Sequence, residues 1–199
     1  MGVTTWAMVE LEADDALGAA AAVADADERV EQVLIVTPDK DLGQCVRGDR
    51  VVQYDRRKRE IMDEAAVTAK FGVPPASIPD YLGLVGDSAD GFPGLPGWGA
   101  KSAAAVLARY GHLEDIPHAG ADWDVNVRGG GKLAVTLRDQ FDLALLFRRI
   151  ATIELDAPTI TKVDELEWHG PRKEFVEVCE RIDAPGLVER ATRLAEARA

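Results

Sequence analysis

Apolar periodicity along this chain predicts an α/β part followed by a larger helical part. The continuous β-branched run Val33–Thr37 is typical of a strand buried on both faces of a parallel sheet. Residues 1–9, 51–54 and 151–156 have strand-like composition or alternation. Helical spacing, Ala-rich composition and the residues typical of helix ends predict helices over 13–26, 63–71, 100–110 and 133–150. A further helix starts at Ser77 or Asp80 and reaches Val85, and two more begin near Pro171 and Pro185.

The segment from Gly86 to Ser102 carries the strongest chemical signal. Asp87 and Asp90 are three residues apart, so a helical backbone would turn both carboxylates toward one hard cation. A Gly- and Pro-rich hairpin follows, in which Gly94, Gly97 and Gly99 favour a turn that exposes backbone N–H groups before the helix over 100–110. The segment therefore pairs a candidate cation site with a candidate phosphate site.

The charges in this region favour a phosphate ligand. No acidic residue occurs between Gly91 and Leu113, whereas Lys101 and Arg109 do. This pattern suits a grip on a nucleic-acid backbone. The alternative is that the glycines only make turns and the paired acids are solvated.

Two further acidic clusters lie upstream. Glu12, Asp14 and Asp15 stand at the start of the Ala-rich helix, where the helix dipole alone also favours acids. Asp39 and Asp41 follow the Val33–Thr37 strand, at the edge where open α/β sheets place their ligands. An N-cap in a βα loop would explain one of these aspartates but not both.

Composition indicates a globular protein without export or membrane signals. Hydrophobic residues make up 47% and charged residues 29% of the 199 residues, and no apolar stretch is long enough to span a bilayer. Two distant cysteines, Cys45 and Cys179, exclude a disulfide scaffold and favour a reducing cytoplasm.

The net charge of −12 opposes nucleic-acid binding unless the basic residues gather locally. Residues 1–31 hold eight acids against Arg29 alone, whereas bases concentrate elsewhere. One such group, Arg56–Arg59, follows the predicted strand over 51–54. It is typical of a solvated hairpin tip, and a DNA contact is the alternative.

The chain resembles the 5′ nuclease family over about residues 3–160, because three of the family's motifs occur in the right order. These motifs are Glu-Ala-Asp-Asp, then Thr-x-Asp-Lys-Asp, and then Gly-Asp-x-x-Asp followed by Pro-Gly-x-x-Gly-x-Gly-x-Lys. This family includes 5′–3′ exonucleases, flap endonucleases and the N-terminal domain of DNA polymerase I. The resemblance implies a Rossmann-like (PIN-like) nuclease core, a helix-hairpin-helix subdomain, and a 151–156 strand that returns to the sheet edge. It implies that the metal-binding and catalytic residues are Glu12, Asp14, Asp15, Asp39, Asp41, Asp87 and Asp90.

Such converging carboxylates would repel one another by several kcal/mol without cations, and all-oxygen ligands favour two Mg²⁺ or Mn²⁺ ions. The resemblance also implies K⁺ at the hairpin and DNA with a 5′ flap, a nick or a single-stranded 5′ end, in replication or repair. The DNA-binding residues would be Gly94, Gly97, Gly99, Lys101 and Ser102.

The resemblance is incomplete at the N-terminus. The family's first strand, with a metal-binding Asp, and its basic arch are not found in the nine residues ahead of Glu10, so we expect an N-terminally incomplete core. Gly91 also stands where the family typically has Asn. We expect a partial α/β core over 1–78, the helix-hairpin-helix subdomain over 79–150, and a return strand with helices over 151–199.

Two other functions remain open. A non-catalytic module would bind duplex DNA through residues 91–111 without metal-dependent turnover. A PIN-type ribonuclease would share the acidic core but should lack the Gly94–Lys101 hairpin. In each case we expect a monomer that does not bind membranes.

Overall fold

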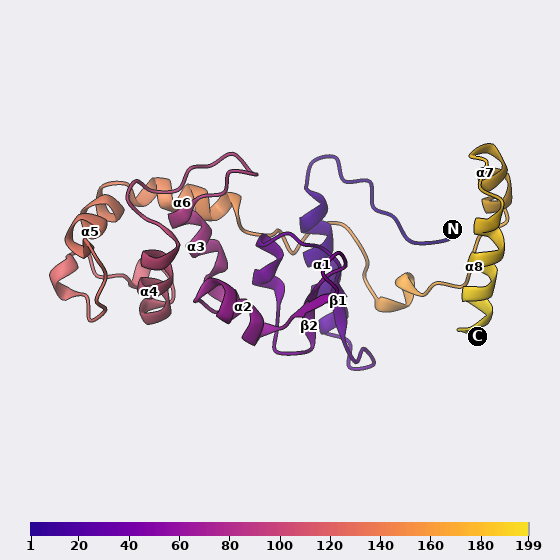
Figure 1. Cartoon of the computed structure of the whole chain (residues 1–199), viewed down its shortest axis with the longest axis horizontal. Helices are drawn as coiled ribbons and strands as arrows, with labels where there is room; N and C mark the ends of the chain where they lie inside the picture. The colour runs from indigo at the N-terminus through magenta and orange to yellow at the C-terminus, as the bar shows by residue number, and fades with distance from the viewer. Residues whose placement is uncertain (199) are drawn as a thin grey trace.

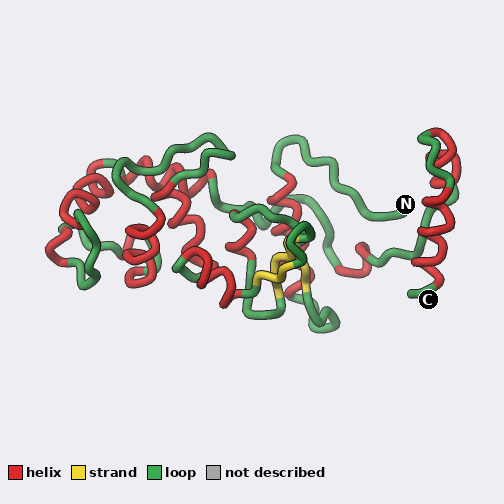
Figure 2. Tube along the Cα trace, in the orientation of Figure 1, coloured by secondary structure: helices red, strands yellow, loops and turns green. Residues whose placement is uncertain are grey.

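A small mixed sheet forms the centre of the molecule. The computed structural model describes residues 1–198. Strands β1 (Val33–Ile35), β2 (Val51–Asp55) and β3 (Glu60–Met62) lie in the order β1-β2-β3. β1 pairs in parallel with β2, with Val33 opposite Val51, and β3 pairs with β2 in antiparallel orientation. Because β1 and β2 are parallel, the segments that follow both strands leave the sheet at the same edge (Figure 2).

Helix α1 (Ala13–Asp25) packs against β1, as the Ala-rich run predicts. Ala21, Ile35, Leu42 and Val51 form the buried cluster between them. The other face of β1 is open, with Leu34 46% and Val36 53% exposed. The prediction of a strand over 33–37 buried on both faces is therefore wrong, because no described helix covers this second face. β2 is the strand that is buried on both faces.

Two predicted strands are absent from the described residues. Residues 1–9 have no regular structure, and Met1 accepts a hydrogen bond from Trp168 Nε1 on its carbonyl oxygen instead of pairing in a sheet. Residues 151–156 also form no strand. Side chains bind their backbone groups: Gln44 contacts the Ala151 oxygen and the Ile153 N–H, and Asp15 accepts from the Glu154 N–H. These side chains take the place of a neighbouring strand.

The second part of the molecule is helical (Figure 1). Helix α2 (Glu64–Phe71) begins after Asp63, which accepts from Ala66 N–H, and ends at Gly72 with φ +75°, both as predicted. The remaining helices are α3 (Ile78–Val85), α4 (Ala100–Tyr110), α5 (Gly130–Asp139), α6 (Phe141–Ile150), α7 (Phe175–Arg181) and α8 (Gly186–Glu196). Single turns of 3₁₀ helix cover Asp41–Cys45, Pro75–Ser77, Leu113–Asp115, Gly120–Asp122 and Val163–Leu166.

The single helix predicted over 133–150 is in fact two. Gln140, at φ −124° and ψ 30°, leaves the helical region and separates α5 from α6. α6 then packs closely along α3, where a Cβ on Gly83 would lie 3.0 Å from the Ala144 oxygen. The break places Leu137 in α5 and both Phe141 and Leu145 in α6, which their regular spacing did not reveal.

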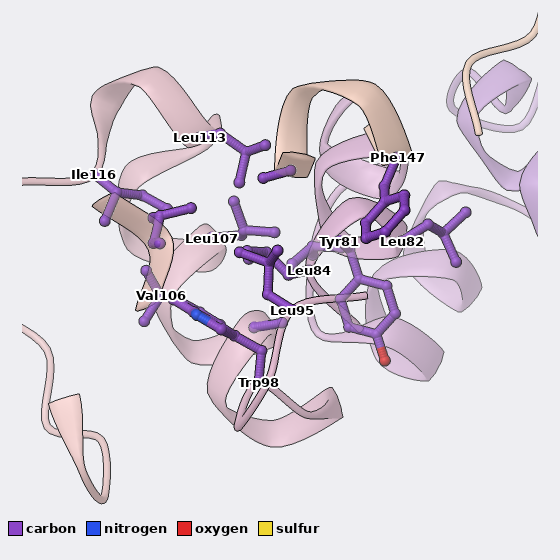
Figure 3. Packing of buried hydrophobic residues seen from close by; sticks show 14 of the residues in the cluster. Tyr81, Leu82, Leu84, Leu95, Trp98, Val106, Leu107, Leu113, Ile116 and Phe147 are labelled. Carbon is purple, nitrogen blue, oxygen red and sulfur yellow. The ribbon is translucent and has the colours of Figure 1, made fainter. Parts of the chain in front are cut away.

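The largest hydrophobic core lies in this helical part (Figure 3). Phe92 stacks on Phe147 with ring centroids 5.5 Å apart, and Trp98 lies 6.0 Å from Trp123. Leu95 is also buried, so the loop between α3 and α4 inserts apolar side chains from both of its ends. Core packing therefore fixes this loop, which carries the strongest sequence motif.

At the other end of the molecule, α7 and α8 form a hairpin with a small core of Phe175, Cys179 and Ala191 (Figure 1). Cys179 is fully buried there, whereas Cys45 is half-buried beside α1. Within residues 1–198, no helix has both the length and the apolar character needed to cross a bilayer.

Candidate metal centre and nucleic-acid interface

Three carboxylates from two distant segments meet at one point. Asp41 follows β1, and Asp87 and Asp90 lie in the loop after α3. Each offers an oxygen within 4.8 Å of the others, and Asp41 and Asp87 are buried whereas Asp90 is exposed. Three of the seven predicted ligands are thus brought within reach of a single ion.

A tight turn, and not a helix, sets the positions of Asp87 and Asp90. Asp87 and Phe92 exchange backbone hydrogen bonds of 2.8 and 3.0 Å, which close the loop between them. Asp87 Oδ1 also accepts from the Ala89 N–H. The helical spacing expected for Asp87 and Asp90 is wrong, but the turn still directs both carboxylates to the Asp41 side.

The acids at the start of α1 face the same space. A cavity of about 430 Å³ is lined by acids from four segments: Glu10, Glu12, Asp14, Asp15, Asp41, Asp90 and Glu154. One base, Arg149, also lines it and pairs with Glu154. Both oxygens of Asp15 accept backbone N–H groups, from Glu12 at 2.9 Å and from Glu154 at 2.8 Å. Asp15 thus fixes the start of α1 against the 151–156 segment, and its role as a metal ligand stays a prediction.

Burial and mutual repulsion disfavour the charged form of two of these acids. Burial, followed by the nearby Asp39 carboxylate, raises the pKa of Asp41 to about 7. The same two causes, in the same order, raise the pKa of Asp14 to about 6. Both shifts mark a site where negative charge is confined without enough compensation, which a bound cation would supply.

Asp41 supplies a direct sign that a ligand belongs here. Its Oδ1 atom is buried and makes no hydrogen bond within the described part of the chain. A buried carboxylate oxygen without a partner is costly, and a metal ion satisfies it. The all-oxygen donor set of Asp41, Asp87 and Asp90 fits a hard divalent cation.

Lys40 is a site residue that the sequence reasoning missed. Its ammonium nitrogen pairs with Asp87 Oδ2. Although burial opposes ionisation of Asp87, Lys40 and the Ala89 N–H outweigh it and hold the pKa of Asp87 below its ordinary value. The position of Lys40 between Asp39 and Asp41 in the sequence was the signal that could have identified it as a site residue.

The glycine hairpin combines structural and binding features. Gly94 and Gly97 have φ of +70° and +84°, whereas Gly99 is extended. Ser102 Oγ accepts from the Gly99 N–H at 3.1 Å, so the Ser102 side chain satisfies this N–H at the start of α4. Lys101 is exposed and has no acidic partner within residues 1–198, which leaves its charge available to a ligand.

Gly94 is needed because its backbone lies against the end of α3. An added Cβ would lie 2.4 Å from backbone atoms of Val85 and Gly86. We expect Gly94→Ala to reduce the free energy of unfolding by about 3 kcal/mol or more, since backbone atoms must move and φ is positive. Gly91→Ala is the matched control, because Gly91 has φ +80° but open space around its Cβ position, and it should cost only about 1 kcal/mol. Urea denaturation measures both, and equal losses would show that the close approach is unimportant.

A second feature missed by the sequence reasoning supports the hairpin. Buried Asp80 of α3 accepts from Arg148 Nη1 of α6 at 2.9 Å and contacts His112 Nδ1 at the same distance. Arg148 also binds Glu114, and these carboxylates raise the pKa of its guanidinium. The network joins α3, α6 and the segment after α4.

Acids at the carboxyl edge of an α/β sheet, next to a helix-hairpin-helix unit, are the arrangement expected for the fold of the PIN-like class of nucleases. Family models confirm this: "5′-3′ exonuclease, N-terminal resolvase-like domain" matches residues 1–72, and "5′-3′ exonuclease, C-terminal SAM fold" matches residues 73–174. The chain belongs to the 5′–3′ exonuclease family. The domain limits predicted above stay a prediction.

Relatives cover most of this chain. It is 32% identical over 179 residues to DNA polymerase I of Bacillus caldotenax, covering 87% of this chain and 19% of that protein. It is 30% identical over 167 residues to a 5′–3′ exonuclease of Buchnera aphidicola, covering 83% of this chain and 57% of that protein. The chain thus spans about a fifth of the polymerase and just over half of the exonuclease.

A solved structure confirms the fold. The T5 5′-exonuclease with bound zinc ions aligns with a TM-score of 0.60 at 19% identity, covering 75% of this chain and 53% of that one. The T5 D15 flap endonuclease in a pseudo-enzyme-product complex with DNA and metal ions also reaches 0.60, over 76% of this chain and 52% of that one.

Proposed function

We propose that this chain acts in divalent-metal-dependent hydrolysis of DNA phosphodiester bonds, as a 5′–3′ exonuclease or flap endonuclease of replication or repair. The single observation that carries the proposal is the meeting of Asp41, Asp87 and Asp90 within 4.8 Å, beside an acid-lined cavity. The relatives named for 5′–3′ exonuclease activity support it. We further propose a cytoplasmic monomer.

The acids would hold the ions from two sides. Asp41, Asp87 and Asp90 form one set. The other set would be Glu12, Asp14 and Asp15 at the start of α1, together with Asp39, whose charge acts on both Asp14 and Asp41. These acids would hold two Mg²⁺ or Mn²⁺ ions, which when bound would supply Lewis-acid activation of a water and charge stabilisation for phosphodiester hydrolysis. Oxygen donors favour these metals over zinc.

The glycine hairpin would hold the DNA backbone at a fixed distance from the acids. Lys101 supplies a cation, and Gly94, Gly97, Gly99 and Ser102 shape the turn and the start of α4. Hairpin carbonyls would bind K⁺ beside a phosphate. The buried side chains of Leu95 and Trp98 keep this loop in place.

Cleavage of a labelled duplex with a 5′ flap tests the proposal. We expect products that require Mg²⁺ or Mn²⁺, and we expect Asp87→Ala to abolish them, because this variant removes one oxygen donor and the partner of Lys40. Asp139→Ala is the control, since Asp139 is exposed and pairs only with its neighbour Arg138.

The same assay separates the alternative, a non-catalytic module that binds duplex DNA. A folded preparation that binds DNA, loses binding in Lys101→Glu, and releases no product with either metal supports this second function. The PIN-type ribonuclease is disfavoured because the hairpin between α3 and α4 is present.

A further inference from the structure

The turn between β2 and β3 is the most concentrated group of bases in the chain. Arg56, Arg57, Lys58 and Arg59 follow one another, and all four are exposed. Asp55 Oδ1 accepts the N–H groups of Arg57 and Lys58 at 2.9 and 3.1 Å, so the backbone of the turn is fixed while its side chains extend into solvent.

These bases differ from most other arginines in lacking acidic partners. Arg29, Arg50, Arg109 and Arg148 all form ion pairs of 3.0 Å or less. Within the described residues Arg56, Arg57 and Arg59 form no ion pair, and Lys58 reaches Asp55 only at 3.9 Å. In a chain with a net charge of −12, this is an unneutralised positive site.

The turn also borders a cleft beside the loop that precedes Asp39. A cleft of about 280 Å³ is lined by Thr37 and Pro38, which precede Asp39, and by the bases Arg57, Lys58 and Lys70 of α2. The acids Asp55 and Glu60 also line it, so its bases outnumber its acids by one. Gln53, which also lines the cleft, donates from its side-chain nitrogen to the backbone carbonyl oxygen of Asp39 at 2.6 Å. This bond joins the cleft to the loop that follows β1. Parallel pairing of β1 and β2 places both walls at the same edge of the sheet.

We propose that this basic turn is a second contact for the nucleic-acid backbone, separate from the glycine hairpin. This inference rests on the proposed function. It means that the substrate strand passes along the cleft beside Thr37 and Pro38 on its way to the acids. The ligand class is the sugar-phosphate backbone, because exposed arginines and lysines bind phosphate groups through their charge and do not distinguish one base from another. The bases also offset the repulsion of DNA by the acidic cavity.

The test is the salt dependence of DNA binding without divalent metal, so that no cleavage is needed. A labelled duplex with a single-stranded 5′ end is titrated with the wild type, with Arg57→Glu/Lys58→Glu, and with Arg172→Glu/Lys173→Glu. The last variant makes the same charge change at an exposed basic pair that follows the 3₁₀ turn Val163–Leu166 and precedes α7.

We expect the turn variant to bind roughly tenfold or more weakly at moderate salt. Its plot of log K against log salt should be less steep by about 2, since each phosphate contact contributes about 0.9. The control pair should leave both values near those of the wild type.

Arg59→Gly separates binding from folding. Arg59 has φ +59°, a conformation that glycine adopts more readily, so this variant should keep or raise the melting temperature. We expect it nonetheless to weaken DNA binding and flatten the salt dependence by about 1.

Each contrary result has a distinct meaning. If the turn variants bind like the wild type while Lys101→Glu loses binding, the basic turn is a solvated tip and the inference is wrong, but the proposed function stands. If the turn variants keep DNA binding but lose binding to poly-glutamate, the partner is an acidic protein and the inference is again wrong. Failure of the wild type itself to bind DNA overturns both.

Discussion

Asp41→Asn should make the metal-free protein more stable and at the same time remove its response to Mg²⁺. The substitution deletes a buried charge whose pKa is raised to about 7 by burial and by neighbouring carboxylates. Relief of this repulsion should raise the free energy of unfolding by about 1 kcal/mol or more, or about 2–4 °C in melting temperature. Loss of an ionised ligand should weaken Mg²⁺ binding at least tenfold and reduce any cleavage by roughly a thousandfold or more.

The pH dependence of the wild type checks the reason for this result. A carboxyl group whose pKa is higher in the folded than in the unfolded protein favours folding at low pH, and this contribution is lost as pH rises from about 4 to 7. Mg²⁺ requires the ionised form, so it should raise the melting temperature more at pH 8 than at pH 5.5. Thermal melts with Mg²⁺ or EDTA at both pH values measure this. If the Asp41→Asn variant keeps the full Mg²⁺ response, Asp41 does not belong to the metal centre.

Asp80→Ala should cost about 3 kcal/mol of stability. Asp80 is 2% exposed and accepts from Arg148 at 2.9 Å and from the Leu113 N–H at 3.3 Å. Removing one member of a buried ion pair leaves the other charge poorly compensated, which typically costs about 3–5 kcal/mol. We expect a loss of stability at the lower end of this range, because Arg148 keeps its hydrogen bonds to Glu114.

Urea denaturation measures this loss, and Asp139→Ala serves as the matched control. Asp139 also pairs with an arginine, at 2.8 Å, but both partners are about half exposed. An exposed pair contributes less than about 1 kcal/mol. Similar small losses in both variants would mean that the Asp80 network does not hold α3 to α6. A selective loss would show that this network holds α3 to α6.

The predictions from sequence were most accurate where local chemistry decides the structure. Asp63 begins α2 and Gly72 ends it as expected, because an N-cap side chain and a left-handed glycine act within a few residues. The predictions were wrong where residues far away in the sequence decide the local structure. The 151–156 segment alternates like a strand, but Gln44 and Asp15 bind its backbone. The apolar spacing continues through Gln140 and so does not encode the break there, where φ is −124° and ψ is 30°.

The sequence by itself determined which residues carry the chemistry: ordered acidic motifs and a glycine hairpin, each readable because spacing within a motif is local. Only the tertiary structure decided which acids meet, since the separation of Asp41 from Asp87 along the chain gives no distance in space. It also decided that Lys40 balances Asp87, that Asp15 binds backbone, and that Arg57 and Lys58 line one cleft with Thr37 and Pro38. These relations follow from how the strands pair and the helices pack, because ion pairing and burial depend on neighbours in space.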